Sequence, residues 1–369
     1  MSDQPVVFET RPATNGKLLG IARLNAEKSL NSLSLAMIDL LQSQLNEWEQ
    51  DAQIAAVWLE GAGEKAFCAG GDVVALHAGS AAYGETLPDD SCERFFEREY
   101  RLDYHIHNYT KPLIVWGSGI VMGGGMGLLC GAPIRIVTET TRMAMPEITI
   151  GLFPDVGGSY FLSRAPGKSG LFLGITGAQF NATDARYLGF ADLFVPAAEK
   201  INLQALVAES EPDTLDTVLS QFADRFAADA PAGQVEAHQA HMDAQCTGDN
   251  TLEIINRIIG YQGDDEWLSR AAKTLARGCP VTPYLVTEQL RRANGASLAD
   301  VFRTELTMGV NAAKHGHFKE GVRALLIDKD RNPQWTPAAF HEVQDQHWQI
   351  FFDSPFTGEH PLTDLGASA

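Results

Sequence analysis

The chain has 369 residues, of which 45% are hydrophobic and 20% are charged, so it can bury a large core and is not disordered in composition. Its formal net charge of −19 repels the phosphates of nucleic acids, and we expect no nucleic-acid partner. An anionic ligand would have to be bound by a few local cations and by backbone amides.

Cysteine usage and the first residues bear on the compartment. The five cysteines are odd in number and form no CxxC pair, which argues against a disulfide framework and favours a reducing environment. The N-terminal residues MSDQPVVFET lack the basic start and apolar run of a secretory signal. No apolar stretch approaches the ~18 residues that a membrane span needs. We therefore expect a cytoplasmic protein without a membrane partner.

The first predicted strand–helix–strand cycle covers residues 17–61. Residues 17–25 (KLLGIARLN) and 55–61 (AAVWLEG) have the apolar content of strands. Between them, apolar residues recur every three or four positions and predict one buried helix face, made of Ile38, Leu41, Leu45 and Trp48. Ser34 is the predicted N-cap of this helix. The small and polar residues 79–90 predict a loop.

A second cycle follows the first. Residues 113–119 (LIVWGSG) and 134–140 (IRIVTET) predict strands, and residues 123–131 (GGGMGLLCG) open a helix between them. Repeated strand–turn–helix units predict an α/β fold with crossover connections. Beyond about residue 200 the pattern is helical almost throughout, so we predict a core over residues 1–200 and a mainly helical region over residues 201–369.

Several common motifs are absent or incomplete. The segment Gly167-Lys168-Ser169 resembles the end of a phosphate-binding loop, but Leu162 stands where that loop needs glycine. No GxGxxG opens a helix after a strand, and no GxSxG is present. Three close pairs of histidines lack supporting Cys or carboxylate spacing. We expect neither a metal nor a redox cofactor.

Two glycine-rich turns each follow an apolar segment, at residues 68–72 (CAGGD) and 122–125 (MGGG). Glycine lets a backbone approach a ligand closely, and a turn that opens a helix points unpaired N–H groups outward. Two such groups aimed at one point would form an oxyanion hole. The alternative is that these glycines only permit tight turns and helix packing.

Two carboxylates follow in an apolar, glycine-bearing stretch. Glu147 lies in MPEITIG and Asp155 in LFPDVGG. A carboxylate in apolar surroundings has a raised pKa and is a candidate for a general base, acid or nucleophile. The alternative is a pair of surface or capping acids.

Three segments resemble the signature segments of the crotonase (enoyl-CoA hydratase/isomerase) superfamily. They are residues 65–72 (KAFCAGGD), 119–128 (GIVMGGGMGL) and 145–164 (MPEITIGLFPDVGGSYFLSR), and the resemblance covers roughly residues 6–200. It implies an acyl-CoA ligand and a spiral of ββα units with a helical C-terminal region. It also implies roles for two groups of residues: oxyanion donors at the N–H groups of Gly71 and Gly124, and coenzyme A contacts from Ala69, Gly70, Asp72 and Lys28.

The carboxylate pattern bears on the reaction. Enoyl-CoA hydratases that resemble this chain have two glutamates; Gly127 stands at the first position and Glu147 at the second. Asp155 stands where those hydratases usually have glycine. Residues 95–100 (FFEREY), the stretch around Asp155 and residues 318–335 (FKEGVRALLIDKDRNPQW) instead resemble the 3-hydroxyisobutyryl-CoA hydrolases of valine breakdown.

This likeness implies hydrolysis of a short 3-hydroxyacyl-CoA to the free acid and coenzyme A. Glu147 would attack the thioester carbon or activate water, and Asp155 would orient the substrate β-hydroxyl and assist proton transfer. Glu99 matches a substrate-contacting glutamate of those hydrolases; the alternative is a solvated helix carboxylate. Two other functions remain open, a hydratase or isomerase with rearranged carboxylates and a non-catalytic acyl-CoA-binding or RNA-binding relative. The sequence is compatible with a homo-oligomer and does not define one.

Overall fold

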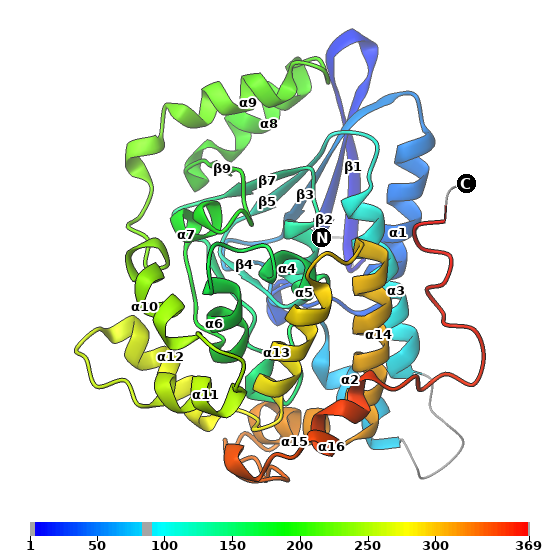
Figure 1. The fold of residues 1–369 in the computed structure, drawn as a ribbon. Helices are drawn as coiled ribbons and strands as arrows, with labels where there is room; N and C mark the ends of the chain where they lie inside the picture. Colours follow the sequence, from blue (N-terminus) through cyan, green and yellow to red (C-terminus); the bar gives the residue numbers. More distant parts are fainter. Residues whose placement is uncertain (1–3, 83–90, 368–369) are drawn as a thin grey trace. The chain divides into compact units, whose positions relative to one another are not determined.

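The computed structural model describes residues 4–82 and 91–367. The chain forms two compact units, and each is assembled from three separate stretches (Figure 1). The unit that we call the sheet unit comprises Met1–Gly71, Leu102–Met143 and Phe180–Glu236. The helical unit comprises Asp72–Arg101, Ala144–Gln179 and Ala237–Ala369.

The main sheet of the sheet unit has six strands in the order β1-β2-β3-β5-β7-β9 within the described residues. The strands are β1 (Val6–Pro12), β2 (Leu18–Leu24), β3 (Ile54–Gly61), β5 (Leu113–Gly117), β7 (Ile134–Val137) and β9 (Leu193–Phe194). The first two strands pair antiparallel and the others join in parallel. All four strands predicted from the sequence are confirmed, and so is the α/β class.

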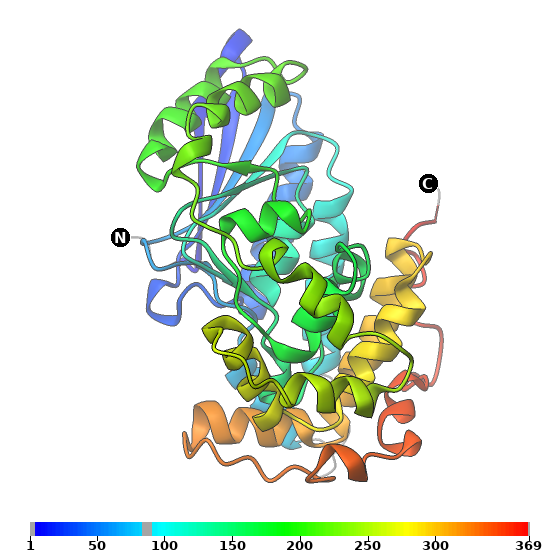
Figure 2. The ribbon, with the colours of Figure 1, turned by 60° about the vertical axis from the view of Figure 1, so that its left-hand side comes forward.

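Helices cover both faces of this sheet. Helix α1 (Leu35–Gln50) begins after Ser34, whose hydroxyl accepts a hydrogen bond from the Met37 N–H, as predicted for its N-cap. Its buried face includes the four residues predicted from the periodicity. Successive residues of a strand point to opposite faces, and Trp58 of β3 packs in a cluster with residues of α8 (Lys200–Glu209) and α9 (Leu215–Asp224). These two helices are green near the top of Figure 2.

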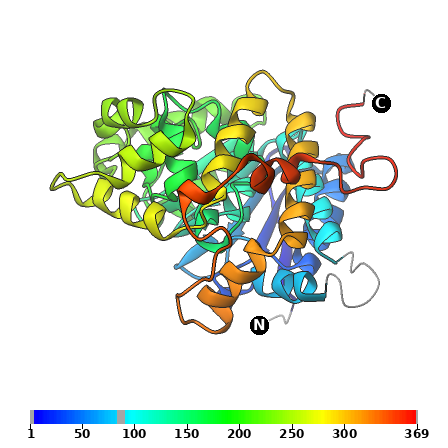
Figure 3. The ribbon, with the colours of Figure 1, turned by 60° about the horizontal axis from the view of Figure 1, so that its bottom comes forward.

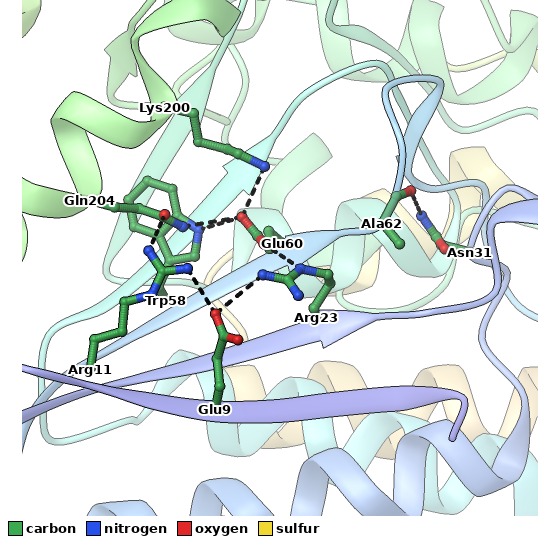
Figure 4. Close-up of polar contacts among 9 residues, drawn as sticks. All are labelled: Glu9, Arg11, Arg23, Asn31, Trp58, Glu60, Ala62, Lys200 and Gln204. Carbon is green, nitrogen blue, oxygen red and sulfur yellow. Dashed lines mark hydrogen bonds and ion pairs between the residues drawn. The ribbon is translucent and has the colours of Figure 1, made fainter. Parts of the chain in front are cut away.

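A buried ionic cluster joins α8 to the sheet (Figure 4). Glu60 of β3 is 1% exposed, and its carboxylate accepts hydrogen bonds from Arg23 Nε at 2.6 Å and Trp58 Nε1 at 3.1 Å. From α8, Lys200 Nζ lies 3.2 Å away and Gln204 Nε2 donates at 3.2 Å. Burial raises the pKa of Glu60, but the charges of Lys200 and Arg23 and their hydrogen bonds outweigh this effect and lower that pKa below its usual value.

A second, small sheet contains β4 (Ala66–Cys68), β6 (Ile120–Met122) and β8 (Arg142–Ala144). We did not predict these strands, because three residues are too few to show an alternating pattern. Strands β4 and β6 pair in parallel, so their carboxyl ends lie at the same edge. Each of these two strands leads directly into one of the glycine-rich turns.

The helical unit confirms the prediction of a helical C-terminal region. After β9 the described chain contains only helices and irregular segments, shown from green to red in Figure 3. The helices that matter for the site are α2 (Val73–Ala82), α3 (Ser91–His107), α5 (Gly158–Leu162), α13 (Thr282–Ala293) and α14 (Leu298–Lys314), and α12 (Glu266–Arg277) lies outside it. Of the predicted loop at 79–90, residues 79–82 continue α2 and residues 83–90 lie outside the described residues. The predicted boundary near residue 200 stays a prediction.

Two further expectations concern cysteines and membranes. All five cysteines are buried free thiols. In the portion of the chain that the structure describes, no helix combines the length and apolar character needed to cross a bilayer.

Candidate active site

The sheet unit brings the two glycine-rich turns together. Gly70 has a φ of +112°, a conformation that side-chain-bearing residues rarely adopt. A Cβ at Gly70 would lie 3.5 Å from the Met122 carbonyl oxygen and 3.8 Å from the Gly124 nitrogen. A Cβ at Gly125 would lie 2.2 Å from the Cys68 carbonyl oxygen, so only glycine fits there. The glycines therefore allow the turn after β4 to lie directly against the turn after β6.

Both predicted oxyanion donors belong to these turns. Gly124 is the first residue of α4 (Gly124–Cys130), and the first N–H groups of a helix have no partner within it. Gly71 follows Gly70, whose carbonyl oxygen accepts a hydrogen bond from the Leu33 N–H at 2.8 Å. Glycine N–H groups in turns that touch each other suit the binding of a developing negative charge. The assignment of Gly71 and Gly124 as donors stays a prediction.

Lys28 lies in a segment that is hydrogen-bonded to the first glycine turn. It is exposed within a short 3-10 helix, Glu27–Ser29. Just beyond it, the Leu30 carbonyl oxygen accepts from the Ala69 N–H at 3.1 Å. The structure thus brings the Lys28 segment to Ala69 and Gly70, two of the predicted coenzyme A contacts.

A buried asparagine, which we did not predict, holds this segment in place. Asn31 is fully buried and has a φ of +56°. Its side-chain amide donates to the carbonyl oxygen of Ala62 at 2.9 Å (Figure 4) and to that of Ala66 at 2.9 Å, and its oxygen accepts from the Ala26 N–H at 3.0 Å. Asparagine tolerates a positive φ better than most residues. This tolerance of a positive φ is the sequence signal that could have indicated the role of Asn31.

In the helical unit, Asp72 caps α2. Its carboxylate accepts a hydrogen bond from the Ala75 N–H at 3.1 Å, which is the usual contact of an N-cap. The structure therefore gives Asp72 a local structural role. Its predicted contact with coenzyme A stays a prediction.

The same unit gathers the three predicted carboxylates. Glu99 comes from α3, Glu147 from the 3-10 helix Glu147–Ile150, and Asp155 from the loop before α5. Glu99 is 2% exposed, and Glu147 and Asp155 are each 5% exposed. Glu99 is therefore not a solvated helix carboxylate, and of the alternative of surface or capping acids for Glu147 and Asp155, the surface position is wrong.

Burial raises the pKa values of all three carboxyl groups, and the charge of Asp155 adds to this effect at Glu99 and Glu147. Burial and the nearby charge of Asp155 hold the pKa values of Glu99 and Glu147 well above their usual range. Burial raises the pKa of Asp155 to about 6, against hydrogen bonds that favour its ionised form. Ionisation of all three carboxyl groups is thus less favourable here than in water.

Two oxygens of this cluster have no hydrogen-bond partner. They are Glu99 Oε1 and Glu147 Oε2, both buried, and neither has a partner among the residues described. A buried polar atom without a partner is costly, and such atoms in native proteins call for an explanation such as a role in binding or catalysis. These two oxygens are suitable contacts for a substrate.

Two neighbours of Asp155 were missed by the sequence analysis. The Tyr100 hydroxyl donates to Asp155 Oδ2 at 2.8 Å. Glu305 of α14 is fully buried and accepts from the N–H groups of Gly157 and Ser159, at 2.7 and 2.8 Å. Tyr100 lies within the FFEREY segment, but Glu305 has no recognisable motif around it. Within residues 4–82 and 91–367, no three His, Cys, Asp or Glu side chains are grouped as metal ligands would be.

The family follows from a comparison with known proteins. The family model described as enoyl-CoA hydratase/isomerase matches residues 19–352. The chain therefore belongs to the enoyl-CoA hydratase/isomerase family and has the crotonase fold, as the signature segments implied.

Individual relatives define the similarity further. The mitochondrial 3-hydroxyisobutyryl-CoA hydrolase of Gallus gallus is 38% identical over 333 residues, covering 89% of this chain and 84% of that protein. The Homo sapiens enzyme of the same name is 36% identical over 341 residues, covering 91% and 86%.

Solved structures of two relatives have the same fold over nearly the whole chain. A carnitinyl-CoA dehydratase from Mycobacterium thermoresistibile has a TM-score of 0.84 and 36% identity, covering 99% of this chain and 100% of that one. An enoyl-CoA hydratase from Rhodobacter sphaeroides has a TM-score of 0.81 and 32% identity, covering 94% and 97%. The names of these relatives include both hydrolases and hydratases, so the choice of reaction depends on the site.

Proposed function

We propose that this protein hydrolyses the thioester of a short 3-hydroxyacyl-CoA, with 3-hydroxyisobutyryl-CoA as the preferred substrate. The main support is the buried pair of Glu147 and Asp155, together with glycine at position 127. Hydration of a double bond requires delivery of both hydroxide and a proton, and the Gly127 position lacks the first of the two hydratase glutamates. The similarity to 3-hydroxyisobutyryl-CoA hydrolases points to the same reaction.

In this proposal the N–H groups of Gly71 and Gly124 stabilise the oxyanion that forms on the thioester carbonyl. Glu147, in its ionised form, either attacks the carbonyl carbon or removes a proton from the water that attacks it. When Glu147 attacks, the carbon–sulfur bond breaks to give an anhydride on Glu147 and the thiolate of coenzyme A; water then hydrolyses the anhydride and supplies the proton of the thiol. When Glu147 is the base, the carbon–sulfur bond breaks and Glu147 passes the proton taken from water to the departing sulfur. Both routes need the same net reactants, thioester and water, and both yield the free acid.

Asp155 and Glu99 recognise the β-hydroxyl end of the substrate in this proposal. The Asp155 carboxylate accepts a hydrogen bond from the hydroxyl. A protonated Glu99, whose pKa is raised by burial, donates through the oxygen that has no protein partner. For the coenzyme A portion we propose contacts from Ala69, Gly70 and Asp72, with Lys28 near the phosphates.

An assay of thiol release against hydration separates the candidate functions. Purified protein should release free coenzyme A from 3-hydroxyisobutyryl-CoA and from 3-hydroxypropionyl-CoA, and it should not hydrate crotonyl-CoA appreciably. Hydration without thiol release would favour a hydratase, the function named for one structural relative. Binding with neither reaction would favour a non-catalytic acyl-CoA-binding protein. A chelator should leave the rate unchanged.

Gly124→Pro tests the oxyanion donor. Proline removes the N–H group but is tolerated in the first turn of a helix. Loss of one oxyanion donor typically lowers kcat by about 10²–10³, so the expected result is a folded variant with little turnover. A folded variant with near-normal turnover would exclude Gly124 as a donor.

Asp155→Asn tests recognition of the hydroxyl. If Asp155 mainly binds this group, the loss of kcat/KM should be large for a 3-hydroxyacyl-CoA and small for the same chain without the hydroxyl. Equal loss on both substrates would place Asp155 in the bond-breaking step. No loss on either would remove it from the site.

The compartment and the pathway stay predictions. The names of the similar hydrolases from Gallus gallus and Homo sapiens include the word mitochondrial, so the cytoplasmic compartment expected for this chain stays a prediction. A role in valine breakdown and a homo-oligomeric state are likewise proposals.

A further inference from the structure

The loop that contains Asp155 is buried throughout. Residues 151–159 are all buried, although they form only a turn and the start of α5. A buried loop must satisfy its backbone polar groups through other parts of the protein, because water cannot reach them. The partners of this backbone therefore show what holds Asp155 in place.

Two successive residues after Asp155 have unusual backbone conformations. Val156 has a φ of +53° and Gly157 a φ of +83°. A positive φ is rare for a β-branched residue such as valine, and such a conformation persists only where the surroundings enforce it. The contacts around Val156 must therefore oppose relaxation of the loop.

Side chains from α13 and α14 supply these contacts. The Thr282 hydroxyl donates to the Leu152 carbonyl oxygen at 2.7 Å, and the Gln289 amide donates to the Pro154 carbonyl oxygen at 2.8 Å. Beyond Val156, the two oxygens of Glu305 each accept one N–H, from Gly157 and from Ser159. The loop is thus held on both sides of Asp155 by side chains from the C-terminal helices.

Glu305 is an unusual hydrogen-bond acceptor for the N–H groups at the start of a helix. Helix starts are normally capped by a residue next to the helix, such as Ser, Thr, Asp or Asn, whereas Glu305 lies 148 residues after Gly157. Burial raises the pKa of Glu305 to about 8, and the two N–H hydrogen bonds act in the opposite direction. Ionisation of the fully buried Glu305 carboxyl group is unfavourable, so its presence here suggests a role beyond packing.

We propose that Glu305 and Tyr100 are positioning residues for Asp155, an inference that rests on the proposed hydrolase function. Glu305 holds the backbone of the loop through the N–H groups of Gly157 and Ser159. Tyr100 donates to Asp155 Oδ2 and thereby fixes the orientation of the carboxylate and favours its ionised form. Neither residue needs to touch the substrate.

The ionisable groups around Asp155 come from three elements. Glu99 and Tyr100 belong to α3, Glu147 to the 3-10 helix after β8, and Glu305 to α14. Burial opposes ionisation of Asp155, whereas the Tyr100 hydroxyl stabilises the carboxylate by donating a hydrogen bond. Removing this hydroxyl should therefore raise the pH at which Asp155 ionises.

The first experiment is steady-state kinetics of Glu305→Gln in the full chain with 3-hydroxyisobutyryl-CoA. Glutamine cannot accept from both N–H groups, so the loop should shift. We expect kcat to fall about 10- to 100-fold with little change in KM, because a small misplacement affects the reaction more than binding. Glu266→Gln is the matched control, since its side chain on α12 is 83% exposed, and it should leave both constants unchanged.

The second experiment is the pH dependence of Tyr100→Phe. Phenylalanine keeps the ring, whose centroid lies 5.8 Å from those of Phe96 and Phe302. The acid limb of kcat/KM should move up by about one pH unit. NMR titration of protein with ¹³C-labelled aspartate carboxyls, assigned with Asp155→Asn, should show the same shift without any substrate.

These measurements separate failure of the inference from failure of the proposed function. If wild-type protein releases no coenzyme A, the hydrolase proposal fails, and the NMR titration still tests whether Tyr100 acts on Asp155. Wild-type kcat and pH profile in a folded Glu305→Gln variant would overturn the role of Glu305. If Glu305→Gln does not fold, the NMR titration of Tyr100→Phe decides. An Asp155 pKa equal to that of the wild type overturns the inference, and a higher Asp155 pKa supports it.

Discussion

Buried carboxylates in the two units have opposite surroundings. In the sheet unit, Glu60 is met by Arg23, Lys200 and two neutral donors, and its pKa is lowered. In the helical unit, Glu99, Glu147 and Asp155 form no ion pair with a cation among the described residues, and their pKa values are raised. Burial alone therefore does not define a reactive acid. The charges and hydrogen-bond donors around the buried carboxyl group define it.

The difference separates a structural acid from candidate catalytic ones. Glu60 is held by Arg23 and Trp58 of the sheet and by Lys200 and Gln204 of α8, so its charge is already compensated before any ligand arrives. Glu147 and Glu99 each keep an oxygen without a protein partner. A group with unused hydrogen-bonding capacity can bind or react with a substrate, and perturbed pKa values cluster at such sites.

The largest expected effect is on turnover in Glu147→Gln. Glutamine keeps the shape of the side chain but can be neither nucleophile nor base, so kcat should fall by a factor of at least ~10². The fold should be retained, because the substitution removes a buried carboxyl group that has no cation to compensate its charge. Thiol release and circular dichroism on the same sample measure the two properties. Retained turnover would end the proposed role of Glu147.

Glu60→Gln should show the reverse pattern. Removing the carboxylate leaves Arg23 and Lys200 without their buried partner, and breaking a buried ion pair typically costs about 3–5 kcal/mol; partial exposure of both cations should keep the loss near the lower value. The free energy of unfolding in urea should fall accordingly. Turnover per folded molecule should stay normal. A Glu60→Gln variant with wild-type stability and lost turnover would contradict the structural role of Glu60.

The pH dependence of hydrolysis should follow Asp155. Its pKa is raised to about 6, so the carboxylate is present above this pH and protonated below it. We expect kcat/KM to fall well below pH 6, and the raised pKa of Glu147, which reacts in its ionised form, to extend the acid limb toward higher pH. A rate profile at constant ionic strength measures this. An acid limb near pH 4 would show that burial does not raise the pKa of the carboxyl group required for turnover.

The smallest effect is on stability in Glu99→Gln. A raised folded-state pKa means that Glu99 favours the folded state below its unfolded pKa, and this contribution is lost as the pH rises through the folded-state value. The variant should therefore gain stability relative to wild type as the pH rises from acid toward neutral. Glu60 has a lowered pKa, so its contribution is present at pH 7 and lost on acidification. Urea unfolding at three pH values tests both signs.

Some features of this protein could be read from short stretches of sequence. The helix face of Ile38, Leu41, Leu45 and Trp48 was predicted because periodicity reports which side of an element is buried. The two glycine-rich turns and the carboxylates at Glu147 and Asp155 were found because each lies within a local motif that resembles one family. The three-residue strands β4 and β6 were missed because they are too short for a pattern.

The amino-acid sequence by itself determined the main strands, the helix after Ser34, the helical C-terminal region and the family. Only the tertiary structure decided that Glu99 is buried, that Asn31 holds the Lys28 segment, and that Glu305 binds the loop of Asp155. The reason is the range of the interactions. Periodicity and motifs report neighbours along the chain, whereas the hydrogen bonds of Glu305 join residues 148 and 146 positions apart. The pKa of a buried acid likewise depends on the partners that folding brings to it.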